Sequence, residues 1–579
     1  MNSETRNCQN CKHDFTIEPD DFSFYEKIKV PAPTFCPECR LIRRMCWRNV
    51  RSLYRRNCNL CQKVLFSMYR DDGAPVMCVE CWNGDDWDIY QNNQDIDWSK
   101  DLFSQILAIL KKQPRIYQYR VGGNVINSEY ANSIANSKNI YLAFSLLDSE
   151  NISYSESVDF SKDSMDSLTT NGIDGCSWNI SSNNNFNCHF MLDSSRNLDS
   201  YFLYDCQNCS NCFMSTNLRN KSFVFKNEQY SEVDYKKILK EYNLNTHTGF
   251  EKAKEEFFEI KEKAIHRYSE IYKSVESTGN YISNSKNAKK SFDITDAEDL
   301  KNTYRIVKSK DLLDCSWVLT GELEYESISG SGQSFYQIGS IVCFASTQMY
   351  YSIFCRNSSN CFACVGLKNA KYCILNKQYT KEEYEQLVPK IIEHMNDMPY
   401  VDKKGSIYKY GEFFPYEFSP FGYNETVALD YFPKHKEEVV LTGFNWTDRE
   451  ERDYSISIAS NDLPDDIKET SDSILNEVIS CPNNGNQTTQ CTSAYKIRQE
   501  DLNFYRQKGL PIPRYCPNCR HYERLKYKNP LRLWHRSCMC CSSGHFHGNS
   551  PCSDEFETTY APERPEKVYC EKCYQSEVL

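Results

Sequence analysis

The sequence has no long hydrophobic run. No segment of its 579 residues approaches the roughly 18 consecutive apolar residues that cross a membrane as a helix. The first 15 residues, MNSETRNCQNCKHDF, lack the apolar core of a signal peptide. We therefore expect a soluble, cytoplasmic protein with no membrane partner. A chain of this length is too long for one hydrophobic core, so several domains are expected.

Signatures of catalysis are equally scarce. The chain has no GxGxxG, P-loop, nucleophile-elbow or HExxH motif, and it has only 10 histidines. We therefore expect no enzymatic activity, no catalytic residue and no organic cofactor. A carbohydrate-active β-helix enzyme is a less favoured alternative. Asp and Ser are plentiful in the central region, but enzymes of that class are usually secreted, and a fold alone says little of activity.

Charge is distributed unevenly along the chain. The formal net charge is −11, but residues 1–81 carry +3 and residues 481–579 carry +4, which leaves −18 for residues 82–480. Basic ends therefore flank an acidic centre. This contrast bears on which partners the ends and the centre can attract.

Cysteine is abundant, with 30 residues. In a reducing compartment, that number favours metal ligation and buried thiols over disulfides. The two ends repeat one cysteine-containing segment with a constant offset of 480 residues. The segment Cys36-Pro37-Glu38-Cys39-Arg40, followed by Cys58 and Cys61, matches Cys516-Pro517-Asn518-Cys519-Arg520, followed by Cys538 and Cys541. This identity of spacing indicates an internal duplication. The cysteines, which are metal-binding residues, are the positions that the two copies share most strictly.

Paired CxxC knuckles predict tetrahedral zinc sites of four thiolates each. Loop lengths favour pairing of the first knuckle with the second and the third with the fourth, while cross-braced pairing remains open. At the C-terminal end, Cys481 is interpreted as a displaced fourth ligand. We expect about four structural zinc ions. The predicted ligands are Cys8, Cys11, Cys36, Cys39, Cys58, Cys61, Cys78, Cys81, Cys481, Cys491, Cys516, Cys519, Cys538, Cys541, Cys570 and Cys573.

Other interpretations of the cysteines are weaker. A redox CxxC needs one motif on a βαβ unit, whereas here the knuckles come in pairs on loop-rich segments. Sites closed by four thiolates have no open position, so catalysis by these ions is not expected. Four further residues near the C-terminus are spare, and one of them could substitute in a site. They are Cys540, His545, His547 and Cys552.

From about residue 130 the composition turns to Ser, Asn and Asp with scattered aromatic and small apolar residues. Asn139, Asn151, Asp163, Gly175 and Asn187 recur every 12 residues. A constant short period without helical spacing is typical of a β-solenoid, in which each coil stacks on the last. We expect the Asn and Asp side chains to hydrogen-bond along the stack and the cysteines of this region to pack inside it.

This array is itself duplicated, since residues 206–235 match 355–384 with an offset of 149. Each copy closes into a helix that starts with a capping box, Ser231 with Asp234 and Thr380 with Glu383. A short amphipathic helix is expected before them, with Ser99 as its N-cap. A helical segment is also expected near LPDDIKETSDSILNEVI.

The expected fold class is therefore a multidomain, β-rich chain with zinc-ribbon-like modules at both ends and two central parallel β-solenoid arrays with intervening α-helices. The expected domains are 1–81, a double zinc-ribbon module; 82–125, an acidic connector with a short helix; 126–230, the first β-solenoid; 231–278, a helical insert; 279–378, the second β-solenoid; 379–480, a helix and irregular connector; and 481–579, a second double zinc-ribbon module.

A basic, aromatic segment lies between the N-terminal knuckles. CRLIRRMCWRNVRSLYRRNC holds seven arginines and no acidic residue, and on a continuous helix six of them would share an arc of about 140°. Arginine with interleaved aromatic rings suits phosphate contact and base stacking. The alternative is that the arginines pair with the acidic connector or solenoid. The predicted nucleic-acid contacts are Arg40, Arg43, Arg44, Arg48, Arg51, Arg55, Arg520, Arg524 and Lys528.

Five segments carry a resemblance to a known family. They are FYEKIKVPAPTFCPECRLIRR, LYRRNC, SPFGYNET, NKQYTKEEY and FYRQKGLPIPRYCPNCRHYERLKYKNPLRLWHRSC. With them the chain resembles a family of uncharacterised bacterial proteins with zinc-ribbon-like ends, abundant in candidate-phyla genomes. The resemblance implies zinc binding and carries no established activity.

The favoured function is a non-enzymatic zinc-stabilised scaffold. Its basic modules would contact nucleic acid or a ribonucleoprotein, and its acidic solenoids would dock a protein partner. The alternative is an interaction protein whose acidic β-solenoid mimics nucleic acid. Binding to RNA with a steep salt dependence would favour the first, and binding to a basic partner without RNA affinity the second.

Overall fold

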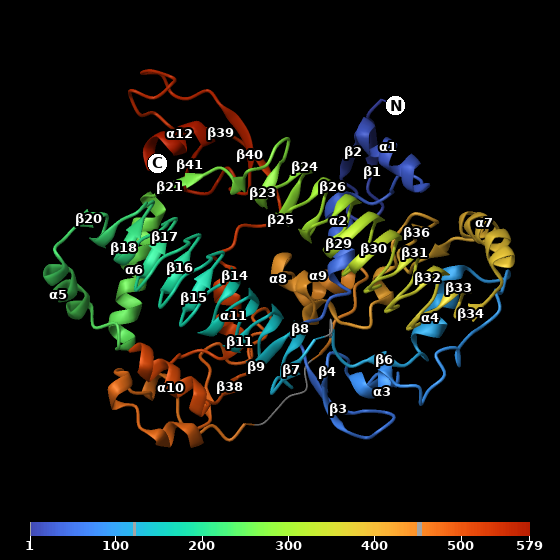
Figure 1. Ribbon diagram of the computed structural model, residues 1–579, viewed down its shortest axis with the longest axis horizontal. Coiled ribbons are helices and arrows are strands. Elements are labelled where there is room, and N and C mark those ends of the chain that lie inside the picture. Colours follow the sequence, from blue (N-terminus) through green and yellow to red (C-terminus); the bar gives the residue numbers. More distant parts are fainter. Residues whose placement is uncertain (1, 120–122, 449–453) are drawn as a thin grey trace.

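The computed structural model describes residues 2–119, 123–448 and 454–579. Two large sheets dominate this part of the chain, one of 14 strands and one of 13 (Figure 1). We refer to residues 125–229 as array 1 and to residues 271–378 as array 2. The predicted β-rich architecture with parallel sheets and cysteine clusters at both ends is confirmed.

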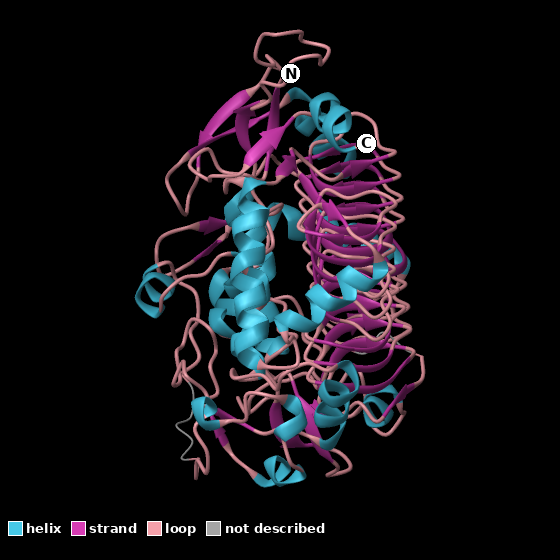
Figure 2. Ribbon diagram, turned by 90° about the vertical axis from the view of Figure 1, so that its left-hand side faces the viewer, coloured by secondary structure: helices cyan, strands magenta, loops and turns pink. Residues whose placement is uncertain are grey.

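Strands of array 1 pair in parallel with their neighbours 12 residues away. Ile152 of β11, for example, lies between Ile140 of β9 and Ser164 of β13. Viewed from the side, the strands of the large sheets form successive stacked rungs (Figure 2). The strands are β7 Val125–Ile126, β8 Asn132–Ala135, β9 Ser137–Tyr141, β10 Phe144–Leu147, β11 Glu150–Ser153, β12 Glu156–Asp159, β13 Lys162–Met165, β14 Leu168–Asn171, β15 Ser177–Ile180, β16 His189–Leu192, β17 Tyr201–Tyr204, β18 Ser210–Thr216, β19 Ser222–Phe225 and the antiparallel β20 Glu228–Gln229.

Array 2 repeats this pairing, as Ile294 lies between Ile282 and Ile306. The offset is interrupted by a register shift between β29 and β30. The strands are β22 Ile271–Tyr272, β23 Gly279–Ser283, β24 Lys286–Lys289, β25 Ser291–Thr295, β26 Glu298–Lys301, β27 Tyr304–Val307, β28 Lys310–Leu313, β29 Ser316–Tyr325, β30 Ser331–Ile338, β31 Thr347–Tyr350, β32 Ser359–Phe362, β33 Lys371–Ile374 and the antiparallel β34 Lys377–Gln378.

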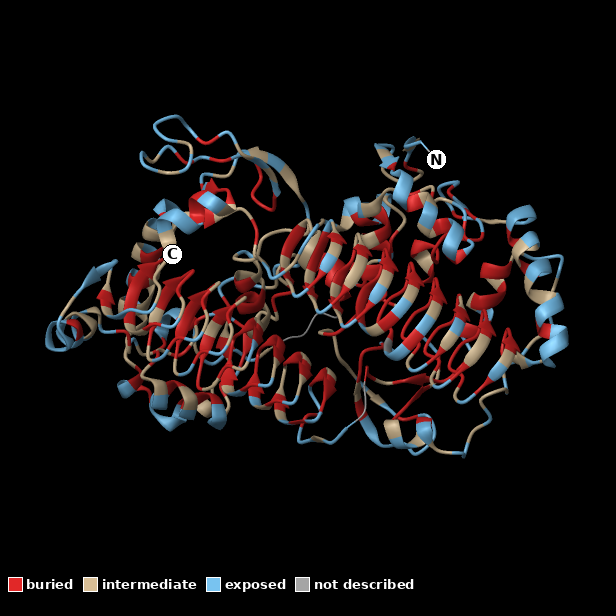
Figure 3. Ribbon diagram, turned by 45° about the horizontal axis from the view of Figure 1, so that its top comes forward, coloured by how far each residue is buried: buried red, intermediate tan, exposed pale blue. Residues whose placement is uncertain are grey.

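A three-residue unit underlies the 12-residue period. Residues 139, 142, 145, 148 and 151 all have φ between 44° and 60°, in the left-handed region. The residue that follows each of them, at positions 140, 143, 146, 149 and 152, is buried. Each coil therefore consists of four triplets, and each triplet has one left-handed corner and one inward side chain. Figure 3 shows buried positions recurring along both arrays. Asn and Asp adopt the left-handed region more readily than most residues, which accounts for their abundance here.

Polar ladders and buried thiols hold successive coils together. The Asn139 side-chain amide donates to Asn151 Oδ1 at 2.8 Å, and Asn151 donates to Asp163 Oδ1 at 2.6 Å, as predicted. Inside the arrays lie aliphatic residues, serines and cysteines. Cys176, Cys206 and Cys361 are fully buried there, so the predicted inward packing of these thiols is confirmed.

Helices follow each array. Array 1 leads into α5 Glu232–Tyr242 and α6 His247–Lys263, and array 2 leads into α7 Lys381–Asp397. The N-cap hydroxyls of Ser231 and Thr380 accept from the predicted backbone N–H groups.

The predicted short amphipathic helix is present but its predicted N-cap was wrong, and the helix predicted over LPDDIKETSDSILNEVI was wrong. Helix α4, Leu102–Leu110, is capped by the Asp101 carboxylate, which accepts from the Ser104 N–H at 2.8 Å, and not by Ser99. The segment near residues 460–476 forms only short 3₁₀ turns, η3 Ser460–Asp462, η4 Ile467–Glu469 and η5 Asp472–Asn476. The buried Arg514 guanidinium donates to the carbonyls of Ser460 and Leu463, which turns them away from helical hydrogen bonds.

The remaining elements belong to the two ends and to the connector after α7. Those of the N-terminal end are β1 Glu4–Asn7, β2 Asp14–Ile17, α1 Pro19–Ile28, α2 Pro37–Met45, β3 Tyr54–Asn57, β4 Val64–Ser67, β5 Val76–Met77, α3 Val79–Asn83 and β6 Arg115–Ile116. Those of the C-terminal end are β37 Ile479–Ser480, β38 Ala494–Tyr495, α10 Gln499–Lys508, α11 Pro517–Leu525, β39 Trp534–Ser537, β40 Glu555–Thr558, β41 Lys567–Tyr569 and α12 Glu571–Val578, with β41 paired to β21 Ile265–Arg267. The connector holds β35 Tyr400–Val401, β36 Ile407–Tyr408, η1 Tyr416–Phe418, η2 Tyr423–Glu425, α8 Val427–Tyr431 and α9 Lys436–Leu441.

Candidate metal centres and the arginines beside them

Four groups of four cysteines have their sulfur atoms within 4.8 Å of one another. All the cysteines of the chain are free thiols in this structure. Sulfur atoms of a tetrahedral zinc site lie about 3.8 Å apart, because each Zn–S bond is about 2.3 Å long. The groups are Cys8, Cys11, Cys36 and Cys39; Cys58, Cys61, Cys78 and Cys81; Cys481, Cys491, Cys516 and Cys519; and Cys538, Cys552, Cys570 and Cys573.

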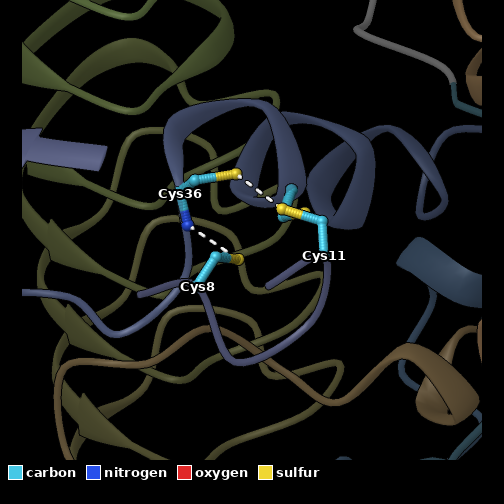
Figure 4. A group of neighbouring side chains, drawn as sticks. Cys8, Cys11 and Cys36 are labelled. Atoms are coloured by element: carbon cyan, nitrogen blue, oxygen red, sulfur yellow. Dashed lines mark hydrogen bonds between the residues drawn. The ribbon is translucent and has the colours of Figure 1, made fainter. Parts of the chain in front are cut away.

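The first group joins a hairpin to a helix start. Cys8 and Cys11 lie in the turn between β1 and β2, and Cys36 is the N-cap of α2 (Figure 4). Cys11 Sγ and Cys36 Sγ are 3.7 Å apart, and the Cys36 N–H donates to Cys8 Sγ at 3.2 Å. Asn10 donates from its side-chain amide to Cys39 Sγ. A helix N-terminus and N–H donors both favour thiolate over thiol.

The same geometry recurs in all four groups. The N–H of the third cysteine donates to the sulfur of the first, at distances from 3.2 to 3.4 Å. The third cysteine is in each case the N-cap of a helix, namely α2, α3, α11 or α12. The N-terminal knuckles are therefore paired sequentially, which removes the cross-braced alternative.

The third group contains Cys481, as the sequence interpretation proposed. Its sulfur lies 3.8 Å from Cys519 Sγ, and it accepts from the Cys516 N–H at 3.4 Å. Asn483 donates to Cys519 Sγ at 3.1 Å, in the role that Asn10 has in the first group. Nine residues lie between Cys481 and Cys491, so the turn of this hairpin is expanded.

The fourth group corrects the sequence assignment. Cys552, which was interpreted as a spare, joins Cys538, Cys570 and Cys573, with its sulfur 3.9 Å from Cys570 Sγ. Cys541 is exposed, and its sulfur contacts the carbonyl of Met539.

The physical reason is the register of the hairpin. In each group the N–H of the first cysteine donates to the carbonyl two residues beyond the second cysteine. In the fourth group this bond runs from Cys538 to Asp554 at 2.8 Å, so Cys552 occupies the ligand position. CxxC spacing finds the second ligand only where the turn is short, whereas the register of the strands finds it in every group.

The predicted nucleic-acid residues on α2 and α11 lie against the arrays. Arg40 Nη2 lies 2.7 Å from Asp314 Oδ2, and Arg44 Nη1 lies 3.0 Å from Glu326 Oε2. In the other module the Arg520 and Arg524 side chains each lie 2.6 Å from the carboxylate of Asp166. Both modules thus use the same contact, because Arg40 and Arg520 differ by 480 residues and Asp314 and Asp166 by 148.

Burial decides what these arginines can contact. The side chains of Arg43, Arg44 and Arg524 are 0% exposed, and that of Arg40 is 3% exposed. The prediction that they face phosphates is therefore wrong for this structure. Among the described residues they instead pair with acidic residues of the arrays, because α2 and α11 pack on those arrays, and Arg43 pairs also with Glu412 of the connector after α7. None of these ion pairs involves the acidic connector after Cys81.

The other predicted basic residues differ in exposure. Arg48 is buried and donates to Ser329 of array 2 and Ser133 of array 1. Lys528, its counterpart, donates to Thr169 and is 5% exposed. Arg51 is partly buried beside Glu156. The six arginines do not share one helix, because α2 ends at Met45. Among the nine predicted residues only Arg55 is exposed.

Burial also shifts the titration of these pairs. It raises the pKa of Asp314, while the neighbouring guanidinium groups of Arg40 and Arg44 lower it. Burial lowers the pKa of Arg524 to about 10, opposed by the Asp166 carboxylate. The guanidinium therefore stays charged at neutral pH and remains paired.

No known family model matches the chain, and a comparison with curated proteins finds no match. The resemblance drawn from the sequence therefore stays a prediction. Within the part of the chain that the structure describes, no helix is long and apolar enough to cross a membrane.

Proposed function

We propose that the chain is a non-enzymatic, zinc-stabilised scaffold in which two double zinc modules hold two β-solenoids together. The observation that carries this proposal is the presence of four groups of four cysteines on one recurring hairpin-and-helix geometry. Four thiolates leave no open coordination position, so each ion would stabilise structure and not act on substrate. The identity of the metal as zinc rests on the ligand type and the tetrahedral spacing.

The buried ion pairs support a clamping role for the modules. Arg40 links the N-terminal module to array 2, and Arg520 links the C-terminal module to array 1. Each module thus contacts the array that is farther from it in sequence, as Figure 1 shows with α2 beside β29. Part of the acidic charge of the centre therefore serves contacts within the molecule.

The charge pattern of the arrays argues against a nucleic-acid mimic. Such a mimic needs rows of like charge, but Lys138 pairs with Glu150 one coil away at 3.2 Å. In array 2, Glu298 lies 3.6 Å from both Lys286 and Lys310 on adjacent coils. Alternating signs along the stack neutralise one another instead of imitating a phosphate backbone.

A cleft between the two ends supports nucleic-acid binding as a second candidate function. The cleft measures about 2300 Å³, and both terminal modules and array 1 line it. Arg55, Arg70 and Lys496 line it, are exposed and have no ion-pair partner among the described residues. Tyr130 lies in the same lining, is exposed and offers a ring for stacking.

Elemental analysis tests the scaffold proposal. The gently purified chain should contain zinc as its main metal, with at least one ion for each of the four groups. Two or fewer ions per chain, or iron as the main metal, would contradict the proposal.

Salt-dependent RNA binding tests the cleft. Replacing Arg55, Arg70 and Lys496 by Gln should weaken binding of single-stranded RNA and lower the slope of log affinity against log salt by about 2, since each phosphate contact releases roughly 0.7 counterions. The matched control replaces Lys237, Lys240 and Lys263 by Gln, which removes the same charge from the exposed faces of α5 and α6. Equal losses of RNA affinity in both variants would mean that the cleft attracts RNA only non-specifically. Unchanged affinity of the cleft variant would mean that the cleft does not bind RNA.

A further inference from the structure

A second set of metal-binding side chains adjoins the fourth cysteine group. Cys540, His545, His547 and Cys573 place one ligand atom each within 4.8 Å of one another. Cys573 belongs to both sets. The other three residues come from the expanded turn between Cys538 and Cys552, which has no counterpart in the short turn between Cys58 and Cys61.

The environment of His547 is that of a metal ligand. Its Nδ1 lies 2.6 Å from the carbonyl oxygen of Ser550, so Nδ1 carries the proton and donates it. The lone pair is then on Nε2, which is buried and has no hydrogen-bond partner in the described structure. A buried imidazole nitrogen without a partner is costly, unless it binds an ion.

His545 is oriented in a similar way from the opposite nitrogen. Its Nε2 lies 3.5 Å from Glu577 Oε1, and its Nδ1 lies 3.3 Å from Cys540 Sγ. A carboxylate at one nitrogen holds the proton there and leaves the other nitrogen as the ligand atom. Cys540 itself is fully buried, so its thiolate would need a cation beside it.

We propose that Cys573 bridges two zinc ions, the ion of the fourth group and a fifth ion held by Cys540, His545 and His547. Seven side chains then complete two tetrahedra, because the bridging thiolate counts in both. Five thiolates around two divalent ions leave a net charge of −1, which is smaller in magnitude than the −2 of an isolated four-thiolate zinc site. Both ions are closed to solvent ligands, so the centre is structural.

This proposal rests on the proposed function, because it assumes that the fourth cysteine group binds a zinc ion. Counting ions separates the two. Native mass spectrometry of the full chain, after dialysis against a small excess of zinc, should find five zinc ions. The double variant His545→Ala with His547→Ala should carry four. His535→Ala, on β39 in the same module but exposed and outside both sets, should carry five.

A conservative variant guards against loss of folding. His547→Cys keeps a metal ligand at the position and should retain five ions, whereas His547→Ala should lose one. Four ions in the wild-type chain would overturn the bridged centre while leaving the scaffold proposal in place. Five ions in the double variant would also overturn it, since the fifth ion would then lie elsewhere. No bound zinc in the wild-type chain would overturn both proposals.

Discussion

Single residues decide which cysteines form the fourth group. Replacing Cys552 by Ser should lower the metal content by at least one ion, because a thiolate ligand of the fourth group is lost. Replacing Cys541 by Ser should leave the content unchanged, because that thiol is exposed. Elemental analysis of the two variants measures the difference. The reverse result would restore the assignment that CxxC spacing gives.

The two variants also mark what the sequence could predict at this scale. Knuckle spacing identifies the first and second groups. Cys481 was correctly assigned to the third group because it is the nearest thiol upstream of Cys491. It fails at Cys541, because spacing along the chain cannot reveal that the turn after Cys538 is expanded. The closing bond from the Cys538 N–H to the Asp554 carbonyl carries that information, and it exists only in three dimensions.

A buried carboxyl inside array 2 makes stability depend on pH. Burial raises the pKa of Glu324 from 4.5 to about 7. Between these values the folded state holds a proton that the unfolded state has released, so stability falls as pH rises. Above pH 7 the loss is complete and amounts to about 3 kcal/mol.

Glu324→Gln has no proton to lose. Its stability relative to the wild type should therefore rise between pH 5 and pH 8, as measured by urea unfolding at each pH. The control Glu322→Gln changes an exposed neighbour and should show no such trend. A difference that does not vary with pH would mean that Glu324 does not titrate in this range.

At the scale of elements, helix α2 is held on array 2 by a buried carboxylate. Asp314→Asn keeps the shape of the side chain but leaves Arg40 and Arg44 without their full counter-charge. The loss of stability should be about 3–5 kcal/mol, since an uncompensated buried charge is costly. Denaturant unfolding followed by the fluorescence of Trp47, which is buried in the same module, measures it.

The matched control is Asp311→Asn, three residues earlier. Its carboxylate pairs with Lys27, whose side chain is 50% exposed. Such a pair contributes less than about 1 kcal/mol. Equal effects of the two substitutions would show that α2 is not held by Asp314.

Elements of the arrays were largely predictable, and their internal geometry was not. The recurrence of Asn139, Asn151 and Asp163 gives the coil length directly. The three-residue unit is hidden, because inward positions hold Ser, Cys, Ala and Ile alike, and hydropathy does not separate them from the corners. The nucleic-acid prediction for the Arg-rich segment was wrong for a related reason. A basic helix face has the same sequence pattern whether it contacts phosphate or a buried Asp.

At the scale of the whole molecule, the two copies of the terminal module pack against the two copies of the array. The Arg40–Asp314 and Arg520–Asp166 pairs join residues 274 and 354 positions apart. No local pattern in the sequence predicts which carboxylate Arg40 or Arg520 contacts. The repetition of the contact in both halves nevertheless makes it a property of the architecture and not of one site.

In the proposed scaffold, bound metal folds the terminal modules, which then hold the arrays. Hydrogen exchange of the full chain with and without a zinc chelator tests it most directly. Removal of the metal should speed exchange in residues 2–83 and 481–579, including α2 and α11, while the inner strands of both arrays stay protected. Unchanged exchange in the modules after metal removal would contradict the claim, and so would an even loss of protection throughout the arrays.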